Sequence, residues 1–505
     1  MIQFVNGNKI KIPRDYSSIA LIKYRLTRVD RRTDQVQCAY TRDKKTEDIF
    51  IHRGMLNIFL KMGLIRSEDI DWISDKNNLW NFSKPCYPED FWDTLLPNIK
   101  LRPEQILAIV RCLESKRGLI QAATGMGKSI IICALVKALE RILGELPPIL
   151  ILVPTRYLVE DMVSKMNGFG IPAVDYADCR GDVSGVVVCH PKSICNDLDC
   201  EKIDLSDVKI IISDEAHHLQ SQTFSRVFEA AENSEIVLGF SASMIDSFKL
   251  PIETHLDRLT IDELRMVSVT GQILLNVPTS FYADGDVLAK SCVIRIYHKI
   301  EEPVDDLRNW HQLRSIQLES QARTLKMAQV AAIFSKFGLK TLILVNTHDH
   351  GYRLLKMLSD YGLREISACS YGSSKFYQYD EEGTLVQLPK DSMEKFKTGE
   401  LKILIGSSHI YEGVDIPNLD SVIMGVVGKS SRRIIQGVGR SLRRTKNGKF
   451  AYIVDFTDND NGILGYHSSK RSHIYKEIIG VSEENYKDGV KISELQDLLM
   501  KIEKN

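Results

Sequence analysis

Small residues followed by a lysine and a serine form the clearest chemical pattern in the sequence. Residues 119–129 read LIQAATGMGKS and lead into an apolar run at 130–139, which predicts a strand, a tight loop and a helix. The spacing A-x-x-x-x-G-K-S is that of a phosphate-binding loop (P-loop), with Ala122 where glycine is commonest. Small side chains let backbone N–H groups surround a phosphate, and the helix N-terminus adds a positive dipole end.

ATP together with Mg²⁺ is the ligand that this loop is expected to bind. Lys128 can reach the β- and γ-phosphates, and the Ser129 hydroxyl can ligate Mg²⁺. The other ATP-binding residues expected in the loop are Ala123, Thr124, Gly125, Met126 and Gly127. A chance turn with the same spacing is the alternative when the loop is considered alone.

Two carboxylates follow a buried strand where they could serve the same reaction. The apolar run at 208–212 leads through Ser213 into the sequence Asp214-Glu215-Ala216-His217. Asp214 would hold Mg²⁺ through water, and Glu215 would orient and deprotonate the attacking water. Asp-Glu after a strand is by itself an ordinary helix cap, but with the P-loop it predicts nucleotide hydrolysis.

Two sets of apolar runs would position these residues. They read as buried parallel strands, which are continuously hydrophobic instead of alternating. The first set lies at 119–121, 149–153, 185–189, 208–212 and 236–240, and the second at 341–345, 365–369, 402–405, 421–424 and 451–455. Each set predicts a doubly wound α/β domain that binds its ligand at the C-terminal ends of the strands. The second domain lacks a P-loop, so we expect it to supply groups to the nucleotide of the first.

Short motifs in the first domain resemble those of the superfamily-2 helicases in type and order. The resemblance implies that Arg102 and Gln105, in a Q-type motif, contact ATP and that Gln105 reads the adenine. It implies nucleic-acid contacts for the residues that match motifs Ia and Ib, although the usual threonine of motif Ib is not obvious: Pro154, Thr155, Arg156, His190 and Ser193. It also implies that hydrolysis is coupled to nucleic acid through the D-E-A-H sequence and motif III, by His217, Ser241 and Ser243.

The second domain carries further motifs of the same family, which extend the resemblance over residues 101–457. A motif V sequence at 407–417 implies nucleotide sensing by Gly413 and Asp415. Two more residues are expected to contact nucleic acid, namely Ser374 in a motif IVa-like stretch and Ser407 in motif V. The motif VI sequence QGVGRSLR places Arg440 and Arg443 on one helix face, from which both can point at the γ-phosphate. The expected catalytic residues are therefore Lys128, Asp214, Glu215, Gln436, Arg440 and Arg443.

The N-terminal region is strongly basic although the chain has equal numbers of acidic and basic residues. Residues 1–66 contain fourteen Lys and Arg against six Asp and Glu, a local net charge of +8. Strand patterns at 20–29 and 35–41 flank a polar turn at 30–34, which predicts a hairpin with a basic tip. The expected nucleic-acid contacts there are Arg28, Arg31 and Arg32. Two interpretations of this basic region stay open: a small duplex-binding module and a solvated basic surface of an ordinary domain.

A second predicted hairpin and a closing helix distinguish the C-terminal half. The stretch 376–388 has two strand-like arms around a D-E-E-G turn and could split strands, guide them or be an inert flap. Residues 467–475 resemble the H-x-x-x-R-x-x-x-Y helix common in the superfamily. The expected organisation is an N-terminal nucleic-acid-binding module (1–97), RecA-like domain 1 (98–250), a connector (251–320), RecA-like domain 2 (321–460) and a helical tail (461–505). The fold class is α/β, with two tandem RecA-like doubly wound domains and a small basic α+β N-terminal domain.

Composition narrows the setting in which this chain works. Ten cysteines without a C-x-x-C pair argue against a zinc site and for reduced thiols in the cytoplasm, that of the host if the protein is phage-encoded. No apolar run approaches 18 residues, so we expect no membrane segment and no secretion signal. We expect a monomer.

The function implied by the resemblance is an ATP-dependent DNA helicase. The basic N-terminal region, the D-E-A-H box and the E-G-V-D-I-P sequence together look like phage-type recombination helicases of the UvsW kind. That likeness implies unwinding or branch migration of branched DNA, namely Holliday junctions, D-loops and forks, with an RNA–DNA hybrid as a further candidate partner. The alternatives are a duplex-DNA translocase of repair or restriction type, an ATP-switched nucleic-acid clamp and, with less support, an RNA helicase.

Overall fold

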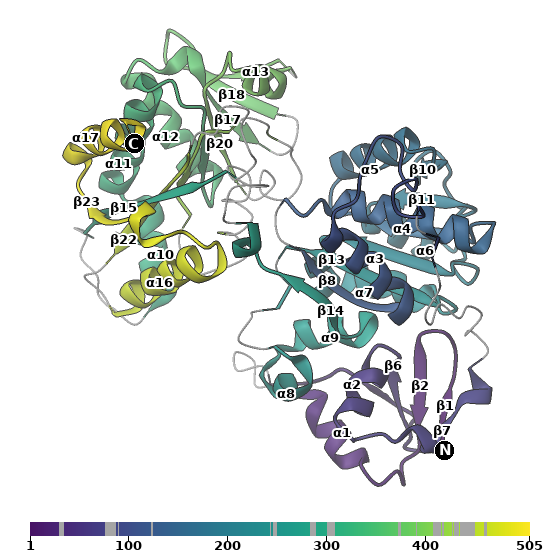
Figure 1. Cartoon of the computed structure of the whole chain (residues 1–505). Helices are drawn as coiled ribbons and strands as arrows, with labels where there is room; N and C mark the ends of the chain where they lie inside the picture. The colour runs from purple at the N-terminus through teal and green to yellow at the C-terminus, as the bar shows by residue number, and fades with distance from the viewer. Residues whose placement is uncertain are drawn as a thin grey trace. The chain divides into compact units, whose positions relative to one another are not determined.

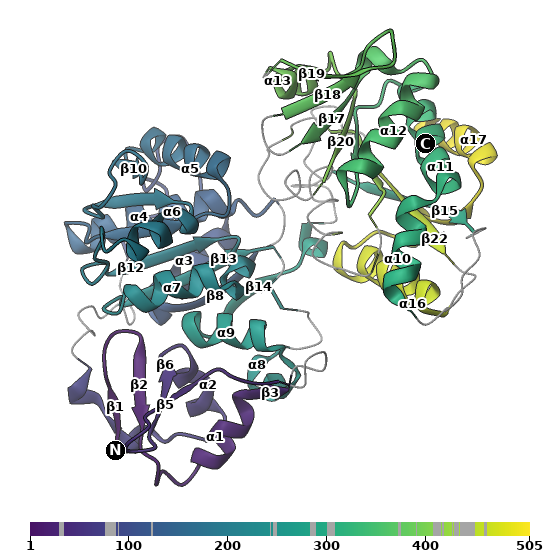
Figure 2. The ribbon, with the colours of Figure 1, turned by 180° about the vertical axis from the view of Figure 1, so that it is seen from behind.

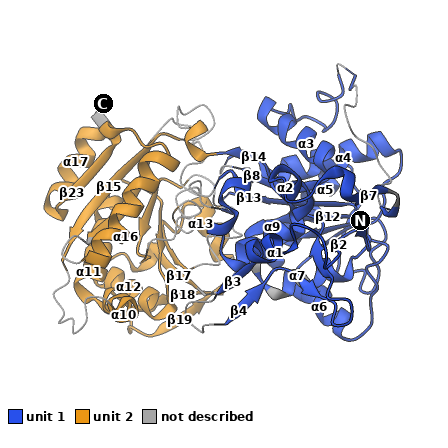
Figure 3. Cartoon of the chain, turned by 90° about the horizontal axis from the view of Figure 1, so that it is seen from below, with its two compact units in different colours: residues 1–277 blue, residues 278–505 orange. Residues whose placement is uncertain are grey.

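The computed structural model of the 505-residue chain divides into two compact units, Met1–Val277 and Pro278–Asn505 (Figures 1 and 3). It describes residues 1–29, 35–75, 87–88, 90–122, 125–242, 244–245, 250–282, 289–299, 309–371, 375–389, 391–407, 416, 419–426, 428, 434, 450–458 and 462–504. No helix in this described part is both long and apolar enough to cross a membrane.

A seven-stranded parallel sheet forms the first α/β domain. Its strand order is β10-β11-β9-β12-β13-β8-β14. The strands are β8 (Arg117–Ala122), β9 (Ile149–Leu152), β10 (Ala173–Asp175), β11 (Val186–Cys189), β12 (Ile210–Asp214), β13 (Ile236–Ser241) and β14 (Ile273–Val277). The helices of this domain are α3 (Pro103–Ser115), α4 (Lys128–Leu143), α5 (Arg156–Gly168), α6 (Pro191–Asp199), α7 (Gln222–Ala230), α8 (Ile252–His255) and α9 (Ile261–Thr270). All five predicted strands are confirmed, and β9 and β11 are buried at every residue, as expected for a sheet covered on both faces.

The N-terminal module has a five-stranded sheet of its own. Its order is β5-β6-β2-β1-β7, and a separate hairpin pairs β3 with β4. The elements are β1 (Ile2–Phe4), β2 (Lys9–Ile12), α1 (Ile19–Arg25), β3 (Thr27–Val29), β4 (Val36–Cys38), β5 (Thr41–Arg42), β6 (Ile49–His52), α2 (Met55–Lys61) and β7 (Ile70–Asp71). The strand predicted at 20–29 is wrong over α1, because Ile22 and Leu26 follow a helical period and both are fully buried. The predicted hairpin is present, and its tip, with Arg31 and Arg32, lies outside the described residues.

The N-terminal module lies against α9 of the first α/β domain (Figure 2), and the two share one hydrophobic core. The Arg117 guanidinium on β8 is buried and donates to the Gly7 carbonyl at 2.8 Å and to Asn8 Oδ1 at 2.6 Å. The Asn8 amide in turn donates to the carbonyl of Phe228 at 3.0 Å. The backbone of the module at Gly54 also packs directly against the backbone of α9. A Cβ placed on Gly54 would lie 2.4 Å from the Ser268 carbonyl oxygen. The predicted boundary at residue 97 therefore does not separate two independent cores.

A nine-stranded mixed sheet forms the second α/β domain. Its order is β19-β18-β17-β20-β16-β21-β22-β15-β23, and its antiparallel pairs are β17–β18 and β18–β19. The strands are β15 (Ser291–His298), β16 (Thr341–Leu344), β17 (Ser367–Tyr371), β18 (Lys375–Tyr379), β19 (Leu385–Leu388), β20 (Ile403–Gly406), β21 (Ser421–Met424), β22 (Ala451–Asp458) and β23 (Tyr486–Val490). The described helices are α10 (Trp310–Glu319), α11 (Gln321–Lys336), α12 (His348–Asp360), α13 (Ser392–Thr398), α16 (Gly462–His473) and α17 (Ile492–Lys504). The hairpin predicted at 376–388 is confirmed as β18 and β19, at one edge of this sheet.

The predicted connector and tail are not separate parts of the fold. Strand β14 closes the first sheet beside β8, and β15 lies inside the second sheet between β22 and β23. Residues 462–504 supply β23 to that sheet, and Leu495 and Leu499 of α17 lie in the second domain's core. On α16, the Arg471 guanidinium donates to the buried Asp455 carboxylate at 2.8 Å, which ties the H-x-x-x-R-x-x-x-Y helix to β22. The chain is divided after Val277 because sheet pairing joins β14 and β15 to different sheets.

Candidate active site

The P-loop has the backbone geometry that its glycines predict. Strand β8 ends at Ala122, and α4 begins at Lys128 directly after Gly127. Gly125 and Gly127 have φ of 90° and 79°, a region that L side chains rarely adopt. Ala122 is fully buried, so this alanine packs at the position where glycine is commonest. Ala123 and Thr124 lie outside the described residues.

Two residues of the Q-type motif hold the P-loop. The Gln105 amide donates to the Met126 carbonyl at 2.8 Å, and its Oε1 accepts from the Arg102 N–H at 2.9 Å. The Arg102 guanidinium donates to the carbonyls of Gly125 and Met126 at 3.0 and 2.9 Å. Both polar atoms of Gln105 are thus bonded within the protein. Contact of Gln105 with adenine stays a prediction. The structure shows that Gln105 also holds the P-loop through its bond to Met126.

The carboxylate pair lies beside the P-loop lysine. Asp214 is the buried last residue of β12, and Glu215 follows it with φ of 51°. Lys128 Nζ lies 3.1 Å from Glu215 Oε1. The structure therefore brings together Lys128, Asp214 and Glu215 as predicted, at the C-terminal ends of β8 and β12.

A chain of hydrogen bonds joins the D-E-A-H sequence to motif III. The Ser241 hydroxyl, at the end of β13, donates to Glu215 Oε2 at 3.0 Å. His217 Nδ1 lies 2.9 Å from the same hydroxyl oxygen. Because the single hydroxyl proton goes to Glu215, His217 donates to Ser241 and carries its proton on Nδ1. Ser243 lies outside the described residues.

The two carboxyl groups have opposite pKa shifts. Burial raises the pKa of Asp214 to about 6, and the Glu215 carboxylate acts in the same direction. Burial would also raise the pKa of Glu215, but the Lys128 ammonium and the His217 contact hold it well below its usual value. Glu215 is therefore ionised at neutral pH, as a base must be.

The donor set at this site suits Mg²⁺. Mg²⁺ prefers hard oxygen ligands and is usually bound by one or two carboxylates together with substrate phosphates. The Ser129 hydroxyl is on the first turn of α4, beside Lys128, whose charge acts on Asp214. Ser129 and Asp214 would supply the protein oxygens, and the phosphates and water would supply the others.

The residues matching motifs Ia and Ib stand at neighbouring helix N-termini. Thr155 caps α5 by accepting from the Leu158 N–H at 3.3 Å, and His190 precedes α6. These helices follow β9 and β11, which are adjacent in the sheet. Two positive dipole ends at one sheet edge suit backbone phosphates. Arg156 is half exposed and pairs with Asp175 at 2.8 Å.

The other predicted nucleic-acid contacts are placed differently. Arg28 donates through Nε to the Leu259 carbonyl at 2.8 Å and also bonds the Leu256 carbonyl. The structure thus uses Arg28 to join the β3–β4 hairpin to the segment between α8 and α9. Ser407 is buried directly after β20. The remaining predicted residues lie outside the described part of the chain: Arg31, Arg32, Ser374, Gly413, Asp415, Gln436, Arg440 and Arg443.

Gln121 is a site residue that sequence reasoning missed. Its Oε1 accepts from the N–H groups of Met244 and Ile245 at 3.1 and 3.2 Å. This side chain therefore fixes the segment after motif III to the strand that precedes the P-loop. The available signal was a glutamine at the end of an otherwise apolar strand.

Two domain families match the chain in the order of its two α/β domains. The type III restriction enzyme res-subunit family matches residues 98–246, and the helicase conserved C-terminal domain family matches residues 325–445. IRC3 of Saccharomyces cerevisiae, named as an ATP-dependent helicase, is 25% identical over 70% of this chain and 51% of its own length. The DNA 3'-5' translocase XPB2 of Sulfurisphaera tokodaii is 22% identical over 74% of this chain and 84% of its own length. The chain thus spans about half the length of IRC3.

Solved structures share the fold. A type I restriction enzyme HsdR fragment from Vibrio vulnificus aligns with a TM-score of 0.57 at 19% identity, over 92% of this chain and 78% of the fragment. Saccharomyces cerevisiae Dbp5 bound to RNA and ADP BeF3 aligns with a TM-score of 0.52 at 15% identity, over 81% of this chain and 98% of Dbp5. T4 UvsW aligns over 97% of this chain and 99% of its own at 16% identity, but its TM-score of 0.42 is too low to support the finer resemblance.

Proposed function

We propose that this superfamily-2 helicase, an ATP-hydrolysing enzyme with two RecA-like domains, unwinds or branch-migrates branched DNA. The observation that carries the hydrolytic part is the hydrogen-bonded set Lys128, Glu215, Ser241 and His217 beside the P-loop. The DNA part is supported by the net charge of +8 in residues 1–66, because neutralising phosphates drives binding to duplex DNA.

Hydrolysis in this proposal begins when Lys128 contacts the β- and γ-phosphates of ATP. Glu215 then loses its nearest cation, and the pKa of its carboxyl rises towards the usual value, which makes it a stronger base. Glu215 takes a proton from water while the water oxygen attacks the γ-phosphorus, and the bond to the ADP oxygen breaks. Mg²⁺ on Ser129 and Asp214 would neutralise charge on the phosphates. Gln436, Arg440 and Arg443 are proposed to stabilise the transferred phosphoryl group.

Coupling to DNA would use the link between the base and motif III. A change in the Glu215 carboxylate alters the acceptor of the Ser241 hydroxyl, and Ser241 is bonded to His217. Thr155, Arg156 and His190 would contact the backbone of one strand at the helix N-termini of α5 and α6. The exposed basic residues of the N-terminal module would contact the duplex arm.

ATPase and unwinding assays on matched substrates test this proposal. Forks, four-way junctions, plain duplex and RNA of equal length are compared at one salt concentration, with Lys128→Ala as the inactive control. We expect the four-way junction to stimulate ATPase most and to be unwound. Equal stimulation by RNA and DNA junctions would contradict the proposed substrate.

Duplex translocation without strand separation is the second candidate. It is favoured by the res-subunit match over 98–246 and by the likeness to a restriction enzyme subunit. A translocase displaces a third strand from a triplex without opening the duplex. Triplex displacement together with intact junctions would replace branched-DNA unwinding by this function.

A further inference from the structure

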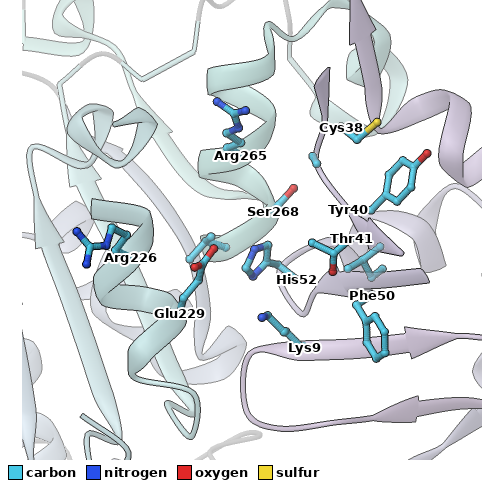
Figure 4. Close-up of a pocket in the computed structure, with 13 residues that line it drawn as sticks. Lys9, Cys38, Tyr40, Thr41, Phe50, His52, Arg226, Glu229, Arg265 and Ser268 are labelled. Atoms are coloured by element: carbon cyan, nitrogen blue, oxygen red, sulfur yellow. The ribbon is translucent and has the colours of Figure 1, made fainter. Parts of the chain in front are cut away.

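A cavity of about 350 Å³ with a mixed polar and apolar lining lies between the N-terminal module and helices α7 and α9 of the first domain. None of the residues of the P-loop, the D-E-A-H sequence or motif III lines it, although α7 lies in the sequence between the last two. Figure 4 shows its walls, with strand residues of the module on one side and side chains from α7 and α9 on the other.

The alternation of strands β2 and β6 builds the first wall. Ile10 and Ile51 are cross-strand partners on the face that is buried in the module's core. Lys9 and His52 are direct cross-strand partners on the opposite face, and both line the cavity. The side chains of Lys9 and His52 have no hydrogen bond or ion pair within the described part of the chain.

Two helices supply the second wall through residues three positions apart. Arg265 and Ser268 lie one turn apart on α9, and Arg226 and Glu229 do so on α7, so each pair shares a helix face. Arg265 is 3.5 Å from Asp262, and Arg226 pairs with Asp199, in both cases with partly exposed side chains. Such exposed pairs hold their cations only weakly. Glu229 is the one carboxylate that lines the cavity among the described residues.

The electrostatic environment of this cavity is positive. Burial lowers the pKa of His52 to about 4, and the cations Lys9 and Arg117 act in the same direction. Lys9, Arg226 and Arg265 line the cavity against Glu229, a balance of three cations to one anion. A neutral imidazole and the Lys9 ammonium can donate to several oxygens of an anion. The Ser268 hydroxyl is buried and already donates to the Leu264 carbonyl at 2.7 Å.

We propose that this cavity binds a phosphate group. Phosphate chemistry fits because Lys9 and Arg265 line the cavity from opposite walls and His52 adds a neutral ring that can donate a hydrogen bond. The volume is at the lower end of the range for small-ligand sites, which suits a phosphate with a small appendage. The phosphate could be free or could belong to a DNA end held near the module, and the shared chemistry is the phosphate dianion. This proposal does not depend on branched DNA being the substrate of the enzyme.

Cys38 provides a local probe of occupancy because this partly exposed residue is one of those that line the cavity. The full chain is treated with iodoacetamide in potassium phosphate or in potassium chloride of equal ionic strength, and alkylation is measured by peptide mass spectrometry. Cys200 is exposed and lies outside the cavity, so it serves as the internal control. We expect phosphate to slow alkylation of Cys38 and not of Cys200. This readout is independent of phosphate bound at the P-loop.

Charge variants of opposite sign sharpen the test. We compare the phosphate concentration that halves the rate of Cys38 alkylation. Lys9→Gln and Arg265→Gln should each raise this concentration about tenfold, and Glu229→Gln should lower it. Changes of this size are expected for single charges a few ångströms from an anion in a partly solvated site. Lys11→Gln is the matched control, since Lys11 shares the strand face but pairs with Asp48 at 3.0 Å and does not line the cavity. No protection in the native chain, or equal protection in Lys9→Gln, overturns the proposal.

A comparison of two DNA duplexes identifies the source of the phosphate. A duplex with 5′-phosphorylated ends and the same duplex with 5′-hydroxyl ends are added without inorganic phosphate. Protection by the phosphorylated duplex alone assigns a DNA end, and protection by inorganic phosphate alone assigns a free phosphate. Protection of Cys38 by the 5′-hydroxyl duplex that persists in Lys9→Gln would mean that DNA merely covers the cysteine, and it overturns the proposal for DNA ends.

Discussion

The Lys128–Glu215 ion pair joins Nζ and Oε1 of two proposed catalytic residues at 3.1 Å, and in the proposed mechanism ATP separates them. In Glu215→Gln, the amide retains the size and one acceptor oxygen but cannot take a proton. We expect ATP binding to persist and kcat to fall by about 10²–10⁴-fold, the usual contribution of a general base. Steady-state ATPase and binding of a fluorescent nucleotide measure the two quantities. Turnover near the native rate would show that another group activates the water.

Asp214 gives the protein a pH-dependent stability. The folded-state pKa of about 6 lies above the unfolded value near 4, so stability decreases as pH rises between these values and is constant above. Asp214→Asn removes the free-energy cost of burying an ionised carboxylate, and its amide oxygen still accepts from the Glu215 N–H. We expect the variant to gain up to about 3 kcal/mol in free energy of unfolding at pH 8 and little at pH 4. Urea denaturation without nucleotide at both pH values measures the difference, and a gain independent of pH would contradict the assignment.

The residues that the structure brings together at the candidate site could be predicted from sequence only where their spacing is local. Lys128, Ser129, Asp214 and Glu215 were found because each stands in a short pattern with a known chemistry. The bonds of Gln105 to Met126 and of Ser241 to Glu215 join segments 21 and 26 residues apart. The bonds of Arg28 could not be predicted for the same reason, since its partners Leu256 and Leu259 are distant in sequence and no local pattern identifies them.

At the scale of elements, close backbone contact joins α2 of the module to α9 and its C-terminal turn. A Cβ on Gly54 would meet the Ser268 oxygen at 2.4 Å and the Gly271 nitrogen at 2.6 Å. Gly54→Ala must therefore push two elements apart, and we expect a loss of about 1–3 kcal/mol, as for other overpacked sites. Gly168→Ala is the control, because a Cβ there meets nothing within 4 Å. Chemical denaturation gives the free energy of unfolding of both variants. Equal values would show that the two elements can move apart without a loss of stability.

Element positions were predictable where strands are central and unpredictable at sheet edges. The apolar runs of β9, β12, β16 and β21 are buried on both faces, so hydrophobicity alone marks them. Strand β23 reads YKDGV with no buried residue, and only its pairing with β15 makes it a strand. The tail was for this reason predicted to be helical throughout.

At the scale of the whole molecule, the shared core changes how DNA binding by the module must be tested. Sequence alone places a boundary before Leu101, which suggests deleting the module. The structure puts module and first-domain residues in one hydrophobic cluster, so deletion would expose apolar surface and confound any loss of DNA binding. Surface charges can be removed without touching this core.

Lys44 and Lys45 are suitable because both are exposed and lie in the turn between β5 and β6. If they contact duplex phosphates, Lys44→Gln/Lys45→Gln should weaken junction binding and make the plot of log K against log salt shallower by about 0.9 for each lost contact. Lys491→Gln/Lys501→Gln removes the same charge from exposed positions of the second unit and is the control. Fluorescence anisotropy over a salt series gives both slopes. Identical slopes in the two double variants and the native chain would mean that the module's charge is only solvated, and recognition of a branch would then be sought at the β18–β19 hairpin.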